Sequence, residues 1–399
     1  MDADVIIVGG GLTGPLAALG LARVGLSSLV LDAAPKPRKN AAFTGRAYAL
    51  ALGSIRLLRG LDLWDGLVHE PITGIRASDG RAGEGASPLH LRFEASEIGE
   101  PMMGAMVEDR HLRTALIAAC EAEPLIEMRF NAPATAQAVN GPNVRVTAAK
   151  KNIAGRLLLG CDGRRSQVGA RAGITWTRRD YGQTSLVCAV THERDHCGVA
   201  HQFFMPPGPL AILPLTERRS SLVWTETAQD AARLNDLPAA EYLDILRPRF
   251  GSFLGEIDLV GERGAWPLTL SLADSLVAAR VALLGDAAHG IHPIAGQGLN
   301  LGIKDVAALS DVMGEALRRG EDIGAADVLA RYQRWRRFDG AAMGLFTDSV
   351  NRLFSNDNSL LRIGRDLGMG AINAIAPIRR RIIREAAGLT GDLPSLMQT

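Results

Sequence analysis

The order of apolar and polar positions divides this chain into buried strands, amphipathic helices and a strand-rich middle. Residues 4–8 form a short, mostly apolar run that ends in three glycines, which is typical of a strand buried on both faces of a parallel sheet. Residues 15–24 (PLAALGLARV) then show helical spacing, and residues 27–32 (SSLVLD) return as a second strand. A strand, a glycine turn, a helix and a strand within about 30 residues predict a nucleotide-binding βαβ unit.

The rest of the chain alternates between helical and strand-like patterns. Helical spacing recurs in four stretches: 54–67, 111–123, the segment from Leu299, and much of 340–390. Short apolar runs predict strands within 71–98 and a mostly antiparallel sheet within 181–266, where only residues 240–250 (AEYLDILRPRF) clearly indicate a helix. Residues 280–285 (RVALLG) form a further buried strand, so we expect the nucleotide-binding sheet to resume there.

Composition and charge exclude several classes of protein. The 399 residues correspond to two or three domains at about 150 residues each. There are 44 basic and 43 acidic residues, with no long block of like charge, which argues against nucleic acid as a partner. The chain is 47% hydrophobic but has no uncharged apolar window of roughly 18 residues that would span a membrane.

Cysteine usage and the N-terminal sequence point to a reduced compartment. The four cysteines form no C-x-x-C pair and no zinc-ligand cluster. The start MDADVIIVGG has no positively charged leader ahead of an apolar core. We therefore expect a cytoplasmic enzyme.

The first motif with a clear chemical task follows the strand at residues 4–8. Its glycines are expected to turn the chain sharply, to admit a pyrophosphate and to pack the next helix on the sheet. The motif comprises Gly9, Gly11, Leu12, Thr13 and Gly14. Asp32 ends the second strand, 18 residues beyond Gly14, where a carboxylate can accept hydrogen bonds from ribose hydroxyls. This context predicts a dinucleotide site and leaves FAD and NAD both open.

A second motif, residues 285–305 (GDAAHGIHPIAGQGLNLGIKD), is the most informative stretch of the chain. Asp286 follows a buried strand and should emerge at the carboxyl edge of the sheet, where it could accept from a ribityl hydroxyl. Gly296 and Gly298 form a turn that leads into the helix from Leu299. The free N–H groups and positive end of that helix favour a flavin that becomes anionic when reduced.

These two motifs, with residues 160–163 (GCDG) between them, resemble the single-component FAD-dependent aromatic hydroxylases. Within that superfamily, HGIHPIAGQGLNLGIKD is similar to the signature of the ubiquinone-biosynthesis hydroxylase family. Similar segments recur along nearly the whole chain, as GRAYALALGS, HQFFMPPGPLAILPL, FTDSVNRLF and GLTGDLP. The resemblance implies an α/β fold: a Rossmann-like FAD-binding domain, interrupted by a mostly antiparallel β-sheet substrate domain, with a helical C-terminal tail.

The expected domain boundaries follow from this resemblance and from the patterns above. The FAD-binding domain is discontinuous and takes residues 1–70, 100–178 and 270–340. The substrate domain takes residues 71–99 and 179–269. The C-terminal helical region takes residues 341–399.

The resemblance also assigns roles to individual residues. Gly9, Gly11, Gly14 and Asp32 would hold the ADP half of FAD. Asp162 would serve FAD and pyridine-nucleotide binding, and Asp286 would contact the ribityl chain. The flavin ring would be bordered by Pro293, Gly296, Gly298, Leu299 and Asn300. The residues expected to approach the flavin or its phosphates are Arg46, Asp109 and Arg110, since guanidinium groups make charge-assisted contacts with phosphate.

The sequence departs from the family pattern at three positions. Thr44 stands where relatives often have aspartate, Gly169 replaces a common arginine, and Asp109 sits where an amide or arginine is more usual. Arg171 is a candidate to substitute for the arginine missing at Gly169.

The activity implied by the resemblance is that of an FAD-dependent monooxygenase. NAD(P)H would reduce FAD, O₂ would form a flavin hydroperoxide, and one oxygen atom would pass to the ring of a polyprenylated phenol in ubiquinone biosynthesis. The implied partners are a hydrophobic phenolic or quinone-like substrate, O₂, other ubiquinone-biosynthesis proteins and the inner face of the membrane. Candidate substrate walls are Phe203, Phe204, Leu210, Ile212 and Leu213, with ordinary core as the alternative.

Several features have two interpretations. The sequence does not select a catalytic acid or base among Tyr181, His201, Gln202 and Trp224. His289 and His292 have the spacing of metal ligands but lie in a Pro/Gly loop without an obvious third ligand, so we expect no metal site. Cys161 is expected to be a small buried residue.

Two alternatives remain for the basic patch and for the function. Arg379, Arg380, Arg381 and Arg384 form either a solvated helix face or a contact with anionic lipid. The alternative functions are a related flavin hydroxylase or reductase with another aromatic or lipid substrate, and a non-catalytic flavoprotein scaffold of a lipid-biosynthesis complex.

Overall fold

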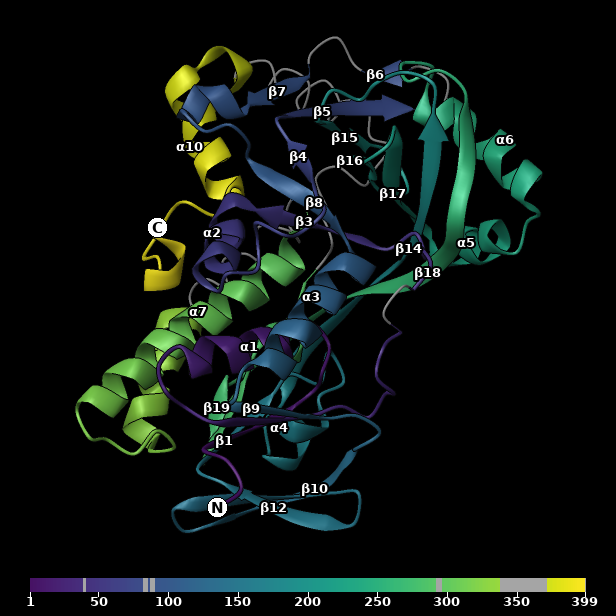
Figure 1. The fold of residues 1–399 in the computed structure, drawn as a ribbon. Coiled ribbons are helices and arrows are strands. Elements are labelled where there is room, and N and C mark those ends of the chain that lie inside the picture. Colours follow the sequence, from purple (N-terminus) through teal and green to yellow (C-terminus); the bar gives the residue numbers. More distant parts are fainter. Residues whose placement is uncertain (39–40, 82–84, 87–89, 292–295, 338–371, 399) are drawn as a thin grey trace.

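The computed structural model describes residues 1–38, 41–81, 85–86, 90–291, 296–337 and 372–398. One six-stranded sheet gathers segments from both ends of this chain (Figure 1). Its strands, in spatial order, are β19 (Val277–Ala278), β20 (Val281–Leu283), β13 (Leu157–Gly160), β1 (Val5–Val8), β2 (Ser28–Leu31) and β9 (Ile126–Arg129). All neighbours are parallel except β19 and β20. The continuous apolar run of β1 suits this central place, and Val5, Ile6 and Ile7 are fully buried.

Helices pack around this sheet and form the largest core of the molecule. They are α1 (Thr13–Ala22), α3 (Asp109–Ala122), α4 (Gln167–Arg171), α7 (Gln297–Arg318) and a helix over residues 326–337. α1 and α7 approach closely, since a Cβ on Gly20 would come within 2.5 Å of Ser310 Oγ. A hairpin sheet of β10 (Ala134–Asn140), β11 (Asn143–Ala148) and β12 (Lys151–Gly155) lies at the far end (Figure 1).

A second, mostly antiparallel sheet carries the middle of the chain. Its path is β21 (His289–Gly290), β18 (Ile257–Ala273), β14 (Trp176–His192), β17 (Arg219–Thr227), β16 (Leu210–Leu215), β15 (Val199–Phe204), β5 (Gly74–Arg81) and β6 (Gly85–Ala86), with β7 (Leu91–Glu94) also paired to β5. Two helices, α5 (Ala228–Asn235) and α6 (Ala239–Phe250), cover one face and bury Leu222, Trp224 and Tyr242. We call this the outer face.

The opposite face, called the inner face, packs on a small sheet that joins the two large ones. That sheet has the order β3 (Ala47–Ala51), β8 (Gly104–Glu108), β4 (Glu70–Ile72), and α2 (Leu52–Gly60) follows it. Met103, Met106, Ala189 and Leu215 share the core between them. The inner face therefore looks toward the carboxyl edge of the six-stranded sheet.

The expected fold class is confirmed, with three local corrections. α2 ends at Gly60, before the predicted residue 67, because the buried Leu63, Trp64 and Leu67 belong to turns rather than to another helical turn. α5 was not predicted; it is short, and the Thr227 side chain caps it by accepting from Asp230 N at 3.1 Å. α7 begins two residues before the predicted Leu299.

The C-terminal segment returns to α2 and α7. α10 (Ala376–Ala386) is helical as predicted, while residues 338–371 lie outside the described residues. Gly53 N donates to Ala387 O at 2.9 Å, and Ser395 N donates to Asp311 Oδ2 at 2.7 Å. No helix in the described part of the chain combines the length and apolarity needed to cross a bilayer.

Candidate active site

Four turns from distant parts of the chain meet at the carboxyl edge of the six-stranded sheet. They follow β20, β13, β1 and β2, which are parallel neighbours in that order. Val8 at the end of β1 stands opposite Gly160 on one side and Leu31 on the other. Ligands of open α/β sheets bind outside the carboxyl ends of the strands, so this edge is the expected place for a cofactor.

The turn after β1 depends on two glycines. Gly9 has a φ of +113°, and a Cβ there would overlap the carbonyl of Cys161 in the turn after β13. A Cβ on Gly14 would overlap the Gly9 carbonyl oxygen. Because backbone lies so close in both cases, the fold itself requires these glycines.

Space for a bound group remains over the N-terminus of α1. Apart from Gly11 itself and its two neighbours in the chain, no described residue has a heavy atom within 4 Å of the position that a Cβ on Gly11 would take. The helix begins at Thr13 after Leu12, and no side chain of the described residues caps its first N–H groups. Uncapped N–H groups at the positive end of a helix dipole suit a pyrophosphate, which fits the phosphate-binding role predicted for this motif.

Asp32 ends β2 beside this turn. Its Oδ1 accepts from Ala34 N at 2.9 Å, and a Cβ on Gly10 would come within 2.5 Å of its Oδ2, so Gly10 gives the carboxylate room. Arg113 of α3 lies near enough to interact with it. Burial alone would lower the pKa of Arg113, but Asp109, with a smaller effect of Asp32, raises it above its ordinary value. The sequence reasoning missed Arg113.

Asp162 follows β13 and supports α4. Its Oδ2 accepts from Gln167 N at 2.7 Å and from Val168 N at 3.1 Å. Its Oδ1 is buried and has no hydrogen-bond partner among the described residues. A buried acceptor without a donor costs free energy, and a donor from a bound cofactor would relieve that cost.

Gly169, which replaces the arginine expected from the resemblance, makes room for Trp176. A Cβ on Gly169 would come within 2.6 Å of Cη2 of that indole. Trp176 Nε1 donates to Ala287 O at 3.0 Å, and the Arg178 guanidinium lies 5.3 Å from the ring centroid. The departure is therefore explained by packing, whereas the substitution by Arg171 stays a prediction.

Asp286 lies at the edge of the site with a half-exposed side chain. It sits in a 3-10 turn, η2 (Gly285–Ala287), and Arg164 Nε donates to its Oδ2 at 3.1 Å. The same guanidinium donates to Thr269 O at 3.2 Å and to Ile291 O at 3.0 Å. Arg164 thus joins Asp286 to β18 and was missed by the sequence reasoning, although it directly follows the GCDG segment.

A buried ion network lies beneath this turn and fixes it. Asp305 Oδ2 accepts from Gly285 N at 3.0 Å, while its Oδ1 contacts His289 Nε2 at 3.2 Å and accepts from Arg336 Nε at 2.8 Å. Burial alone would raise the pKa of Asp305, but His289 and Arg336 hold it below its ordinary value. His289 is thus engaged by Asp305, and His292 lies outside the described residues.

The start of α7 brings the second glycine motif to the same edge. Gly296 precedes the helix with a φ of +64°, and a Cβ on Gly298 would lie 4.0 Å from Asp286 Oδ1. Among the described residues no side chain caps this helix, and the backbone N–H groups at its start can be offered to a bound group, as at α1. Leu299 is half-buried in the first turn, and Pro293 lies outside the described residues.

Asn300 ties this helix start to β3 and α2. Its Oδ1 accepts from Ala51 N at 2.8 Å and from Ser54 Oγ at 2.7 Å. Its Nδ2 donates to Ala49 O at 2.9 Å and to Gly296 O at 3.0 Å. All of the hydrogen bonds described for the Asn300 side chain are therefore made within the protein. If this segment borders a flavin, as the resemblance implies, it would do so through its backbone.

Arg46 and Asp109 are neighbours at the end of the joining sheet. Asp109 N donates to Arg46 O at 3.0 Å, and the exposed Arg46 guanidinium lies 5.4 Å from the ring centroid of Tyr48. The Asp109 carboxylate accepts from Tyr48 Oη at 2.8 Å and pairs with Arg113 at 3.3 Å. Burial, with the contact to Asp109, raises the pKa of Tyr48 well above its ordinary value.

Arg110 belongs to a separate cluster between the sheets. Its Nε donates to Glu108 Oε2 at 2.7 Å, and Arg219 of β17 pairs with the other carboxylate oxygen at 2.8 Å. Phe43 lies between the two guanidinium groups, 5.7 and 5.1 Å from its ring centroid. Both Glu108 and Arg219 are buried, so this cluster fixes the second sheet against the joining sheet.

Strand alternation decides which side chains of the second sheet face the site. His201 and Trp224 are on the outer face, against Phe253 and Tyr242 of the α6 region, so neither can act at the carboxyl edge. Phe203, Leu210 and Ile212 share the outer core, and the alternative of ordinary core holds for all three. Leu213 packs on the inner side.

A strip of small apolar side chains crosses the inner face. Val223 of β17 stands opposite Val187 of β14 and Ala211 of β16 in the strand register. All three are half-buried, in contrast to the fully buried Leu222 and Trp224 beside them. The strip was not predicted, because the run SLVWTET does not reveal which of its apolar residues faces which side.

Comparisons with known proteins agree with this geometry. Residues 2–343 match the FAD binding domain family. Ubiquinone hydroxylase UbiL of Rhodospirillum rubrum is 43% identical over 99% of this chain and 92% of its own length. The 3-demethoxyubiquinol 3-hydroxylase of Escherichia coli is 35% identical over 97% of this chain and 98% of its own length.

The fold is also found in a solved structure. The p-nitrophenol 4-monooxygenase PnpA from Pseudomonas putida DLL-E4 has a TM-score of 0.79 at 18% sequence identity, over 97% of this chain and 98% of that chain. At this identity the likeness concerns the fold. With its two uncapped helix N-termini, its glycine turns and a family match over most of its length, the chain belongs to the FAD-binding domain family of FAD-dependent monooxygenases.

Proposed function

We propose that this enzyme hydroxylates the aromatic ring of a polyprenylated phenol in ubiquinone biosynthesis, with NAD(P)H as electron donor. The observation that carries the proposal is the meeting of four turns at one sheet edge, together with an apolar strip on the face of the second sheet that packs on the joining sheet. The names of the relatives from Rhodospirillum rubrum and Escherichia coli support the substrate class.

We propose that the two halves of FAD are bound near the starts of two helices, the ADP half at α1 and the flavin half at α7. The turn from Gly9 to Gly14 would hold the pyrophosphate and Asp32 the ribose, while Asp286 would meet the ribityl chain and the backbone of 296–300 the flavin ring. Bound FAD supplies the redox chemistry that activates O₂. We keep residues 1–70, 100–178 and 270–340 as the proposed FAD-binding domain, with 71–99 and 179–269 as the substrate domain.

The protein's own contribution is to place the substrate and exclude water. Val187, Ala211 and Val223 offer an apolar surface to a prenylated ring, since burying their exposed area favours an uncharged ligand at about 25 cal/mol per Å². Near-zero net charge, 44 basic against 43 acidic residues, suits a neutral substrate.

The deciding experiment follows oxygen into the product. FAD-loaded enzyme is incubated with NAD(P)H, a prenylated phenol and ¹⁸O₂, and we expect one ¹⁸O atom in the hydroxylated ring by mass spectrometry. Val223→Phe should raise KM for the prenylated phenol and leave FAD affinity unchanged, whereas Val223→Ala should bind both as before. If the parent enzyme oxidises NAD(P)H but the phenol gains no ¹⁸O, the result would support the reductase alternative.

A scaffold function predicts a different result. If the chain only holds other proteins together, Asp286→Ala would leave assembly intact and no phenol would be turned over by the parent enzyme. Under our proposal Asp286→Ala weakens FAD binding and turnover together.

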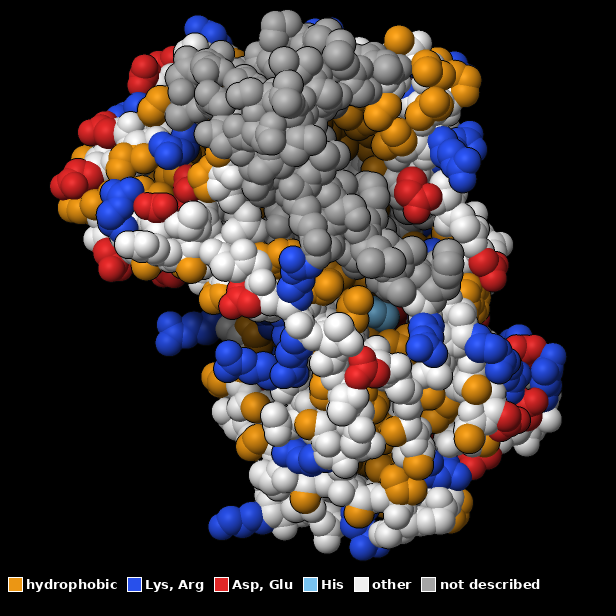
Figure 2. Space-filling view, turned by 180° about the vertical axis from the view of Figure 1, so that it is seen from behind, with side chains coloured by type: hydrophobic (Ala, Val, Ile, Leu, Met, Phe, Trp, Pro, Cys, Tyr) orange, Lys and Arg blue, Asp and Glu red, His pale blue; other side chains and the backbone are white. Residues whose placement is uncertain are grey.

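We further propose that α10 makes a peripheral contact with anionic lipid, and we keep association with other ubiquinone-biosynthesis proteins as a separate prediction without an assigned surface. Ile375 and Ile378 are 46% and 45% exposed, and Arg380 and Arg381 are exposed on the same short stretch. Hydrophobic and basic side chains adjoin one another over this part of the molecule (Figure 2). Apolar and cationic groups together are typical of surfaces that bind the membrane interface.

A further inference from the structure

Arg164 joins three segments that meet at the cofactor edge. It directly follows the GCDG turn after β13, and its guanidinium donates in three directions. Nε donates to Asp286 Oδ2 at 3.1 Å, Nη1 to Thr269 O at 3.2 Å, and Nη2 to Ile291 O at 3.0 Å. These acceptors belong to the turn after β20, to β18 of the second sheet, and to the segment that leads toward Pro293.

The Arg164 side chain is also held along its aliphatic part. A Cβ on Gly290 would come within 3.1 Å of Arg164 Cγ and 3.2 Å of its Cδ, so these carbons lie against the Gly290 backbone. A planar guanidinium has its donors fixed relative to one another and loses little freedom for each hydrogen bond that it forms. Arg164 is therefore a well-anchored group, although its side chain is 33% exposed.

Asp286 depends on this anchored group for its orientation. Its side chain is 44% exposed, and the terminal torsion of an aspartate is broad unless a partner fixes it. Arg164 bonds to Oδ2. The other oxygen, Oδ1, lies toward α7, 4.0 Å from the position that a Cβ on Gly298 would take. The guanidinium thus turns the second carboxylate oxygen toward the helix start where we place the flavin.

From this geometry we propose that Arg164 is a positioning residue for FAD: it holds the Asp286 carboxylate so that Oδ1 meets the ribityl chain, and it does not touch the cofactor itself. The inference rests on the proposed contact between Asp286 and that chain. A polar group binds a ligand more tightly when its own supporting hydrogen bonds fix it beforehand. The effect of Arg164 on FAD should therefore pass through Asp286.

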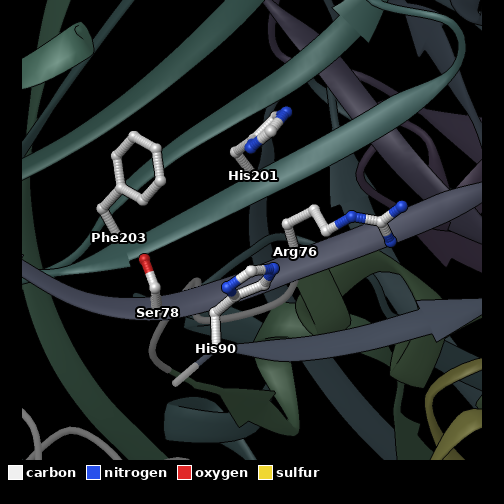
Figure 3. Close-up of a pocket in the computed structure, with 5 residues that line it drawn as sticks. All are labelled: Arg76, Ser78, His90, His201 and Phe203. Atoms are coloured by element: carbon white, nitrogen blue, oxygen red, sulfur yellow. The ribbon is translucent and has the colours of Figure 1, made fainter. Parts of the chain in front are cut away.

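A second arginine–carboxylate pair offers a matched control away from the cofactor edge. Arg76 of β5 pairs with Glu94 at 2.6 Å, and these side chains are 25% and 41% exposed, much as Arg164 and Asp286 are. Arg76 lines a cavity of about 200 Å³ on the outer face of the second sheet (Figure 3). The other described residues around this cavity are Ser78, His90, His201 and Phe203. A variant at Arg76 therefore loses the same kind of ion pair on the opposite side of that sheet.

The test is a double-mutant cycle on the affinity of the full-length apoprotein for FAD, measured by fluorescence titration. Arg164→Ala should raise the FAD dissociation constant about tenfold, the size of one lost hydrogen bond that involves a charged group. In the Asp286→Ala background the same change should alter the constant by less than about twofold, because the carboxylate that Arg164 orients is gone.

Three further variants separate positioning from charge and from general damage. Arg164→Lys keeps the charge but cannot bond to three acceptors at once, so it should weaken FAD binding nearly as much as Arg164→Ala. Arg76→Ala, and Arg165→Ala at the exposed neighbouring position, should bind FAD as the parent does. Should Arg164→Ala fail to fold, the cycle is run with Arg164→Lys.

Three outcomes would overturn the inference. The first is an FAD affinity that Arg164→Ala leaves unchanged. The second is an equal loss in the parent and in the Asp286→Ala background, which would mean that Arg164 acts on FAD without Asp286. The third is full affinity in Arg164→Lys, which would assign the effect to charge alone. If Asp286→Ala binds FAD as the parent does, the ribityl contact and this inference fail together, while the ¹⁸O experiment still decides the hydroxylation.

Discussion

Individual glycines around the first turn have two separable tasks. Gly14 is fixed by backbone overlap, whereas Gly11 borders open space above α1. Sequence spacing cannot distinguish these tasks, because both positions simply read as glycine in the same motif. The difference can be measured by adding one methyl group at each position.

Gly14→Ala should therefore lower stability, whereas Gly11→Ala should mainly weaken FAD binding. Gly14→Ala forces the start of α1 away from the Gly9 carbonyl and should reduce the free energy of unfolding by about 2–4 kcal/mol. Gly11→Ala should change stability by less than about 1 kcal/mol but weaken FAD binding, because its methyl group occupies the pyrophosphate side. Urea unfolding of the apoprotein and FAD titration by fluorescence check the pair. Equal loss of stability in both variants would contradict this division.

A second residue-scale prediction concerns His201 and pH. Its folded pKa of about 4 lies below its ordinary value of 6.5, so between these values the unfolded chain binds a proton more readily. The free energy of unfolding contributed by neutral His201 is thus complete above pH 6.5 and is lost as the pH falls toward 4. His201→Gln should flatten this decline by about 1–2 kcal/mol in urea unfolding at pH 6.5 and 4.5. An unchanged slope would mean that other groups cause the decline.

At the scale of elements, Asn300 joins α7 to β3 and α2 through three hydrogen bonds, and a fourth runs to Gly296 O at the start of its own helix. Asn300→Leu should leave these groups unpaired and lower the free energy of unfolding by about 2–4 kcal/mol, while also loosening the helix start that we propose borders the flavin. Melting temperature and the FAD dissociation constant should change together. As a control, Asn235→Leu at the end of α5 should move neither; a flavin affinity that survives Asn300→Leu would rule out this coupling.

Elements with strong local signals could be predicted from the sequence, and those determined by distant partners could not. The βαβ unit, α6, α7 and the strand before Asp286 follow from apolar runs, caps and glycines. Arg164 and the cluster of Glu108 with Arg219 could not be found, because each acquires its partner only when segments far apart in the chain become neighbours. His201 and Trp224 were wrong candidates for a catalytic acid or base for the same reason. The face of the sheet to which a side chain points is fixed by the pairing register of the strand with its neighbours. Arg113 was missed although its main partner, Asp109, lies four residues earlier on the same helix.

At the scale of the whole molecule, α10 places apolar and basic groups side by side on the surface. Arg380→Glu with Arg381→Glu should reduce binding to phosphatidylglycerol vesicles at least about tenfold, at roughly 1 kcal/mol per charge, and Ile378→Asp should reduce it further. Cosedimentation measures the bound fraction, which should also fall with added salt. Arg233→Glu is the control on a distant helix. Equal binding to neutral phosphatidylcholine vesicles would contradict a role for the arginines.

The two long strands β14 and β18 limit how the second sheet can move relative to the six-stranded sheet. Each has 17 residues and belongs to the sheet that faces the cofactor edge, while their paired ends at Trp176 and Ala273 reach the turns of the six-stranded sheet. A movement of the second sheet relative to the six-stranded sheet must therefore bend the paired strands β14 and β18. The ladder between these strands is interrupted twice, between Asp180 and Thr184, where Gly182 has a φ of +64°, and between Val187 and Ala189, so we expect the pair of strands to bend at these two places.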